Sequence, residues 1–145
     1  MATDALPALA CACASLRRAA RAVTQLYDAE LQGTGLRVTQ LTLLQALQRM
    51  GSSPQAALGE LLALDATTLS RTLRPLAGAG WIRATRGQDR RETRWALTAA
   101  GRRRFARARP SWERAQARLR TRLRPEHWKL LVEDLALVAG AARRA

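Results

Sequence analysis

The feature that most constrains the fold is an amphipathic segment followed directly by an arginine-rich hairpin, between Leu64 and Gly101. The first half spaces Leu69, Leu73 and Leu76 by four and three residues, which is the periodicity of a helix with one buried face. The polar residues that project away from this face are Thr67, Thr68, Ser70, Arg71 and Arg74. A polar, cationic helix face beside a cationic hairpin predicts contact with duplex DNA.

The second half predicts a two-stranded hairpin, because residues that favour β-structure flank a polar tip that contains Gly87. Residues 81–85 and 93–97 form the expected strands. Five arginines occur from Arg83 to Arg94, and only Asp89 and Glu92 oppose them. This local positive charge suits phosphates or the negative potential of a narrow minor groove.

The charge of the whole chain points the same way, because 25 basic against 11 acidic residues leave a net charge of +14. A polyanionic partner explains this imbalance. Charge alone also fits a non-specific architectural DNA-binding protein, which would bind all duplexes alike. An enzyme is not indicated, since no carboxylate pair, metal-ligand spacing, phosphate loop or Cys-His set occurs, and we expect no cofactor and no metal.

The length of 145 residues and the 48% hydrophobic content suit one ordinary domain with its own core. No apolar run reaches the ~18 residues of a membrane-spanning helix, so we expect no membrane association. The N-terminus carries Asp4 and no basic residue before its modest apolar stretch, unlike a secretory signal. These features predict a cytoplasmic protein.

Helical periodicity predicts six helices around the hairpin. Their expected extents are Leu9 to Leu31, Thr39 to Met50, Pro54 to Leu62, the Asp65 cap to Gly78 and Gly80, the Thr98 cap to about Arg122, and Pro125 to Ala142. Ser53 is expected to cap the third helix, with Pro54 in its first turn. Pro75 should bend its helix or tighten the last turn, and Pro110 should restart or kink the fifth helix, because proline removes a backbone hydrogen bond.

This order of elements predicts a mainly α fold, a winged helix-turn-helix with a two-stranded β-wing. The outer helices carry long apolar stripes that the central module does not need, so we expect them to form a homodimer. We therefore divide the chain into an N-terminal dimerisation helix (1–35), a winged helix-turn-helix DNA-binding domain (36–101) and C-terminal dimerisation helices (102–145), in one compact domain overall. Such a dimer would bind an inverted-repeat operator.

The sequence resembles the MarR family of bacterial transcriptional regulators along essentially its whole length. The matching motifs are GLRVTQLTLLQAL at 35–47, GAGWI at 78–82, Asp89-Arg90-Arg91 at the hairpin tip, and LTAAG at 97–101. The resemblance implies a sequence-specific regulator, usually a repressor. It also implies release from DNA by a small phenolic or lipophilic ligand or by oxidation of a cysteine.

The resemblance assigns site residues as well. The fourth expected helix, which follows the Asp65 cap, would be the reader helix and would lie in the major groove. Its side chains that contact bases or phosphates would be Thr67, Thr68, Ser70, Arg71 and Arg74. In the wing, Asp89 would orient the Arg91 guanidinium into the minor groove. The expected contacts of the wing are Arg86, Asp89, Arg90 and Arg91.

Cys13 and Tyr27 resemble one branch of that family, the organic-peroxide sensors called OhrR, in which a reactive cysteine precedes by fourteen residues a tyrosine that hydrogen-bonds it. An organic hydroperoxide would oxidise the Cys13 thiolate and shift the helix. The branch's second tyrosine is absent, since Val38 or a neighbour takes its place, and Cys11 or a small thiol would have to resolve the oxidised sulfur. Alternatively, Cys13 is a packed small hydrophobe, or Cys11 and Cys13 of two subunits bind a soft metal.

Overall fold

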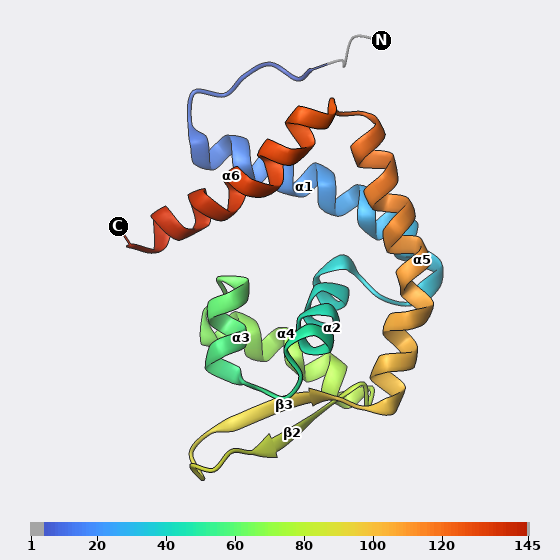
Figure 1. The fold of residues 1–145 in the computed structure, drawn as a ribbon, viewed down its shortest axis with the longest axis vertical. Helices are drawn as coiled ribbons and strands as arrows, with labels where there is room; N and C mark the ends of the chain where they lie inside the picture. Colours follow the sequence, from blue (N-terminus) through green and yellow to red (C-terminus); the bar gives the residue numbers. More distant parts are fainter. Residues whose placement is uncertain (1–4, 145) are drawn as a thin grey trace. The chain divides into compact units, whose positions relative to one another are not determined.

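A computed structural model describes residues 5–144, so Asp4 lies outside the described part. The elements are α1 (Ala12–Leu31), the 3-10 helix η1 (Gln32–Thr34), α2 (Val38–Met50), β1 (Ser53–Pro54), α3 (Gln55–Leu62), α4 (Ala66–Gly78), β2 (Ile82–Arg86), β3 (Thr93–Leu97), α5 (Ala99–Thr121) and α6 (Pro125–Arg144) (Figure 1). This order confirms the mainly α winged helix-turn-helix fold. Within residues 5–144, no helix has the length and apolar character needed to cross a membrane.

The sheet has three antiparallel strands in the order β1-β3-β2. In the hairpin, Ile82 pairs with Leu97 and Ala84 pairs with Trp95. The third strand corrects the expectation for Ser53 and Pro54, which pair with β3 and do not form the first turn of α3. Pro54 has φ −57° and ψ 144°, an extended conformation that suits an edge strand and places Pro54 at the N-cap of α3.

The helices α4 and α5 both continue through their internal prolines. The expected restart of the helix at Pro110 was wrong, because α5 runs from Ala99 to Thr121 without a break in its helical assignment. Pro75 and Pro110 are both exposed, so each ring faces solvent, and proline removes a single backbone donor from its helix. Beyond Pro75, the Ala79 N–H still donates to the Pro75 carbonyl at 3.0 Å.

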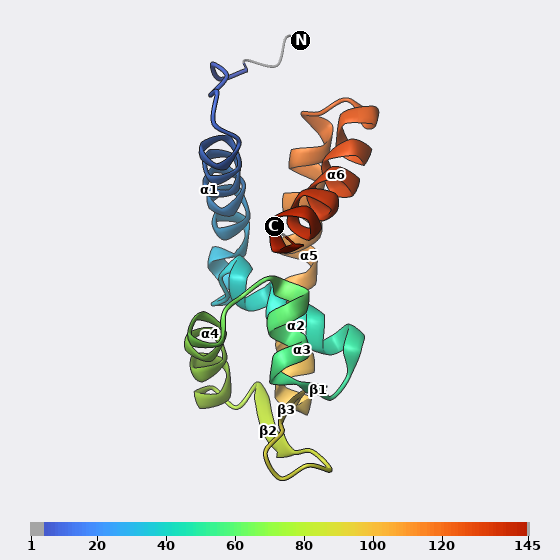
Figure 2. The same ribbon diagram turned by 90° about the vertical axis from the view of Figure 1, so that its left-hand side faces the viewer.

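The chain divides into two compact units, one from Leu31 to Ser111 and the other comprising the segments before and after it. In the first of these, α4 contacts β2, α2 contacts β3 and α3 contacts β1. Figure 2 shows the β2–β3 hairpin extending beyond the helices of this unit. Its core is mainly leucine: the fully buried large side chains are Leu31, Leu41, Leu43, Leu44, Leu47, Leu58, Leu69, Leu73 and Leu76.

The other unit contains α1, the last part of α5, and α6. The Tyr27 hydroxyl donates to Gln116 Oε1 at 2.6 Å, and Glu30 forms salt bridges with Arg114 (3.3 Å) and Arg118. Helix α1 starts at Ala12, three residues later than expected, so Cys11 precedes it. Large apolar side chains of α6 are exposed: they are Leu130, Val132, Leu135, Leu137 and Val138.

Candidate nucleic-acid interface

Helix α4 begins at the Asp65 cap that the sequence predicts. One carboxylate oxygen of Asp65 accepts from the Thr68 N–H at 2.8 Å, and the other accepts from the Thr68 hydroxyl at 2.7 Å. The hydrogen bond from the Thr68 hydroxyl is the main reason that the pKa of Asp65 is lowered. Because Thr68 uses its only hydroxyl proton here, its side chain can accept a hydrogen bond from DNA but cannot donate one.

The other end of α4 is closed by Gly80, as expected. The Trp81 N–H donates to the Leu76 carbonyl and the Gly80 N–H donates to the Ala77 carbonyl, both at 3.0 Å. Gly80 has φ +72°, in the left-handed region that glycine adopts without strain. This pair of bonds is the Schellman motif, so backbone groups at both ends of α4 are hydrogen-bonded.

The burial of α4 matches its predicted two faces. Leu69, Leu73 and Leu76 are at most 1% exposed. The five side chains predicted to read DNA are all exposed on this one helix: Thr67, Thr68, Ser70, Arg71 and Arg74. Their contacts with DNA stay a prediction. Because all five are exposed on the same helix, one DNA duplex could contact them together.

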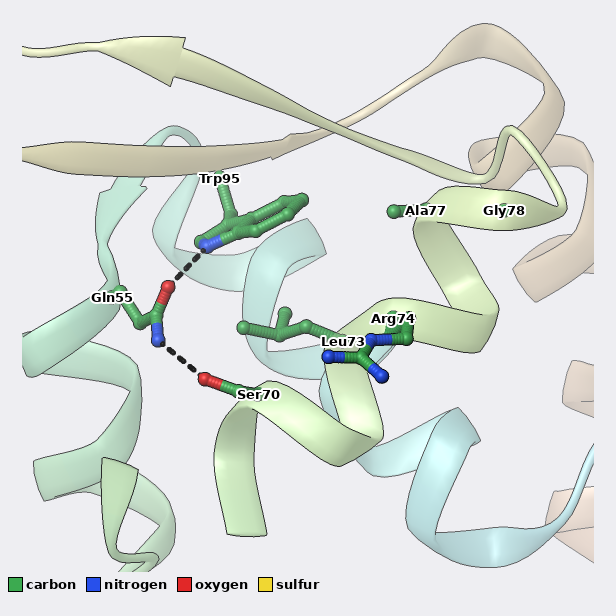
Figure 3. A pocket seen from close by; sticks show the side chains of 7 residues that line it. All are labelled: Gln55, Ser70, Leu73, Arg74, Ala77, Gly78 and Trp95. Atoms are coloured by element: carbon green, nitrogen blue, oxygen red, sulfur yellow. Dashed lines mark hydrogen bonds between the residues drawn. The ribbon is translucent and has the colours of Figure 1, made fainter. Parts of the chain in front are cut away.

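A hollow of about 420 Å³ lies beside this helix, lined by Gln55, Ser70, Leu73, Arg74, Ala77, Gly78 and Trp95 (Figure 3). Two hydrogen bonds cross it. The Trp95 indole N–H donates to Gln55 Oε1 at 3.0 Å, and Gln55 Nε2 donates to Ser70 Oγ at 3.1 Å. Sequence reasoning missed Gln55 and Trp95, because only the observed strand register and the packing of α3 bring them next to α4.

The tip of the wing is held by short-range hydrogen bonds. The Gly87 N–H donates to the Glu92 carbonyl at 3.0 Å, and the Glu92 N–H donates to the Asp89 carbonyl at 2.9 Å. Asp89 Oδ1 accepts from the main-chain N–H of Arg91 at 3.0 Å. The contact of Asp89 is therefore with the backbone of Arg91, whereas the resemblance implied the guanidinium. The side chains of Arg86, Arg90 and Arg91 are exposed.

Arg94 has a different part in the wing. Its guanidinium donates to the Ser52 carbonyl at 2.7 Å and to the Ser52 hydroxyl at 3.3 Å, and it pairs with Glu92 at 3.2 Å. Arg94 thus ties the hairpin to the loop before β1. It contributes less to the free positive charge of the wing than the sequence alone indicated.

The base of the wing is fixed against the start of α5. The Thr98 hydroxyl accepts from the Gly101 N–H at 3.0 Å and donates to the Gly80 carbonyl at 2.6 Å, which confirms Thr98 as the helix cap. The Arg104 guanidinium lies 4.7 Å from the centre of the Trp81 ring, within cation–π range. Trp81 therefore connects the end of α4 to α5.

The residues predicted to sense oxidants are not brought together within one chain. Cys11 and Cys13 are free and exposed, whereas Tyr27 is 8% exposed and donates to Gln116. Cys13 and Tyr27 lie fourteen residues apart on the same helix, a separation of roughly 21 Å at 1.5 Å per residue. A hydrogen bond between them could form only between two copies of the chain. Burial raises the pKa of Tyr27.

The capped helix with a polar outer face, the short strand β1 and the cationic hairpin define this unit as a winged helix-turn-helix of the DNA-binding type. The family model named MarR family matches residues 36–93. The transcriptional regulator MosR of M. tuberculosis, solved in complex with DNA, has 34% sequence identity and a TM-score of 0.84, over 92% of this chain and 97% of that one. The chain belongs to the MarR family.

Two further proteins are similar. The uncharacterized HTH-type transcriptional regulator YwoH of Bacillus subtilis is 29% identical over 83 residues, which are 57% of this chain, and the match spans 61% of the length of that relative. The PcaV transcriptional regulator of Streptomyces coelicolor, solved with its natural ligand, has 25% identity and a TM-score of 0.82, over 95% of this chain and 99% of that one.

Proposed function

We propose that this chain is a sequence-specific, DNA-binding transcriptional regulator that acts as a homodimeric repressor on an inverted-repeat operator in the cytoplasm. The observation that carries the proposal is the location of the exposed polar face of α4 and the cationic wing in one compact unit with a common core. A helix of this kind fits the major groove, and a hairpin of this kind can reach the flanking phosphates or the minor groove. The DNA complex of MosR supports the proposal.

Each part of the interface has a role in this proposal. Arg71 and Arg74 donate to guanine O6 and N7 or to phosphates, and Thr67 adds a further polar contact. Thr68 accepts from a base amino group, since its proton is used on Asp65. Arg91 enters the minor groove, with Arg86 and Arg90 beside it on the wing. The exposed apolar residues of α6, including Leu130 and Leu137, supply the dimer contact.

Binding to DNA is tested by fluorescence polarisation with the chain's own upstream intergenic DNA and with a scrambled duplex of equal length. Arg71→Ala should reduce operator affinity by about fivefold or more and leave affinity for the scrambled duplex unchanged, because a base contact carries sequence information. Arg124→Ala, an exposed charge outside the reader and the wing, is the charge-matched control. Equal losses on both duplexes would reassign Arg71 to phosphate contact.

The wing is tested by the salt dependence of the same binding. Arg91→Ala should weaken binding and make the slope of log affinity against log salt shallower by about 0.9, as expected for one neutralised phosphate or groove contact. Unchanged affinity would remove Arg91 from the interface. A wild-type chain that binds operator and scrambled DNA alike would favour the architectural alternative, which rests on the net charge of +14.

Release from DNA has two proposed triggers, a phenolic or lipophilic ligand and an organic hydroperoxide. The ligand-bound structure of PcaV supports the first, and the exposure of Cys13 supports access of an oxidant to the thiol. Adding cumene hydroperoxide and then dithiothreitol to the protein–DNA complex distinguishes the two triggers. Reversible release that Cys13→Ser abolishes, while Cys11→Ser retains it, would establish a thiol switch at Cys13. Binding that is indifferent to the oxidant would direct attention to small ligands.

A further inference from the structure

Three side chains from three elements form a hydrogen-bonded chain that ends on the reader helix (Figure 3). Trp95 of β3 donates to Gln55 of α3, and Gln55 donates to Ser70 of α4. Trp95 and Gln55 are half-buried and Ser70 is exposed, so the chain runs from the wing toward the outer face of α4.

The direction of this chain is fixed by chemistry. An indole N–H is a donor only, so the oxygen of the Gln55 amide must face Trp95. The nitrogen of the same amide then faces Ser70 and donates to it, which makes Ser70 Oγ the acceptor in that bond. The Ser70 hydroxyl proton is left to point elsewhere.

The remaining proton of Ser70 is not used inside the described part of the chain. Within residues 5–144, Gln55 is the one hydrogen-bond partner of the Ser70 hydroxyl. By contrast, the nearby Thr72 hydroxyl donates to the Thr68 carbonyl at 3.0 Å, and the Thr42 hydroxyl donates to the Val38 carbonyl at 2.8 Å. Ser70 thus keeps an outward donor on the exposed face of the helix, where these threonines donate back to their own helix.

We propose that Gln55 and Trp95 are positioning residues that direct the hydroxyl proton of Ser70 toward DNA. This inference rests on the proposed function and adds a rule of specificity to it. The operator should present an acceptor opposite Ser70, such as purine N7, guanine O6, thymine O4 or a phosphate oxygen. An amino group of adenine or cytosine at that position could use only the second lone pair of Ser70 Oγ and would leave the directed proton without a partner, so it should be bound less tightly.

The first test replaces operator bases and phosphates one at a time with analogues that lack one acceptor. These are 7-deazapurines for N7, 2-aminopurine for guanine O6, 5-methyl-2-pyrimidinone for thymine O4, and methylphosphonates for the phosphate oxygens. Wild-type binding should fall about fivefold at one position in each half-site, the loss expected for one hydrogen bond. Ser70→Ala should lose the same affinity on the natural operator and become insensitive at that position. Ser70→Thr, which keeps the hydroxyl, should restore the sensitivity. Whether a base analogue or a methylphosphonate identifies the position decides between a base contact and a phosphate contact.

The second test reverses the chain with Gln55→Glu. A carboxylate can only accept, so it accepts from both Trp95 and Ser70 and turns the Ser70 proton inward. The variant should therefore behave like Ser70→Ala and lose sensitivity at the same position. Gln88→Glu, an added charge on the exposed wing, measures the loss that comes from charge alone. Once that loss is subtracted, the losses of operator affinity caused by Ser70→Ala and by Gln55→Glu should not add in the double variant. Both substitutions remove the same donor, the Ser70 hydroxyl proton that faces DNA.

The outcomes distinguish a failure of the proposed function from a failure of the inferred role of Ser70. A wild-type chain that binds every duplex alike would overturn the proposed function. Two outcomes would overturn this inference alone, provided that the wild-type chain binds its operator specifically. In the first, Ser70→Ala keeps full operator affinity. In the second, no single substituted operator position affects wild type and Ser70→Ala differently. Ser70→Ala and Ser70→Thr change only an exposed side chain, so they give a result even if Gln55→Glu lowers the thermal unfolding midpoint.

Discussion

At the scale of single residues, Gly101 is the glycine of the described residues at which an added Cβ would meet the closest backbone atom. It is buried in the first turn of α5, and a Cβ atom placed on it would overlap the carbonyl oxygen of Trp81. That carbonyl accepts from the Thr98 N–H at 3.0 Å, so the main chain of the wing base and the start of α5 are in direct contact. The glycine of the LTAAG motif is therefore required by close backbone approach, at an ordinary helical conformation.

We expect Gly101→Ala to lower the free energy of unfolding by about 1–3 kcal/mol, because a backbone carbonyl cannot move aside as a flexible side chain can. Gly78→Ala is the matched control, since a Cβ there would meet nothing within 4 Å. The control should be neutral or stabilising by up to about 1 kcal/mol, given the better helix propensity of alanine. Urea denaturation measures both, and equal effects at the two sites would contradict the proposed contact.

The side-chain periodicity of α4 was sufficient to predict its buried leucines and its exposed polar residues, because that pattern is local. The same reasoning could not find Gln55 or Trp95. Their role depends on the pairing of Ala84 with Trp95 and on the packing of α3 against the sheet, which no local spacing encodes. The role of Arg94 was hidden for the same reason, since its partner Ser52 is 42 residues away.

At the scale of elements, α4 is a helix with a side-chain cap at its start and a glycine cap at its end. Asp65 closes the start with two bonds to Thr68, and Gly80 closes the end. The first turn carries Thr67 and Thr68, so the cap holds two of the proposed DNA contacts. Loss of the cap should therefore affect binding as well as stability.

Asp65→Ala should lower both the thermal unfolding midpoint and the operator affinity, because the first turn of α4 loses its cap. Asp65→Asn should keep the midpoint, since its amide oxygen can still accept from the Thr68 N–H, and should bind the operator more tightly than Asp65→Ala does. Its amide nitrogen cannot accept from the Thr68 hydroxyl, so the hydroxyl proton of Thr68 becomes free. Calorimetry measures the unfolding midpoints of the two variants, and fluorescence polarisation measures their operator affinities. If Asp65→Ala bound as tightly as Asp65→Asn, the order of the first turn would not matter for recognition.

Strand β1 shows where local rules fail for an element. Ser53-Pro54 has the composition of a helix start, and two residues are too few to display the alternation of a strand. Its pairing with Trp95 and Arg94 is set by the position of β3. Pro110 likewise predicted a restart or a kink of the helix, whereas α5 continues through it, with Ala108 and Ser111 buried on either side.

At the scale of the whole molecule, the terminal unit is connected by polar contacts between α1 and α5. Glu30 pairs with Arg118 and Arg114, and the hydrogen bond from Arg118 is the main reason that the pKa of Glu30 lies below its ordinary value of 4.5. A lowered folded-state pKa contributes stability above the unfolded-state pKa, and this contribution is lost as the pH falls through the folded value. The acid side of the stability curve should therefore report on this contact.

We expect Glu30→Gln to lower the thermal unfolding midpoint near neutral pH. The difference from wild type should shrink as the pH falls below 4.5, because wild-type Glu30 then becomes protonated as well. Thermal scans between about pH 7 and pH 3 test this. A difference that stays constant over the range would show that the charge of Glu30 does not contribute.

The wing tip has a consequence for how proteins of this design can diversify. Its main-chain groups bond Gly87 to Glu92 and Glu92 to Asp89, and the Asp89 carboxylate accepts from the Arg91 N–H, so these bonds lie within the tip itself. The Glu92 side chain also pairs with Arg94, outside the tip. The leucine core takes no part in them, and Arg94 anchors the hairpin behind the tip. Residues can therefore be inserted, deleted or exchanged between Gly87 and Glu92 without repacking the interior. Under the proposed function, substitutions in the tip would change the DNA contacts of Arg90 and Arg91 while the leucine core stays the same.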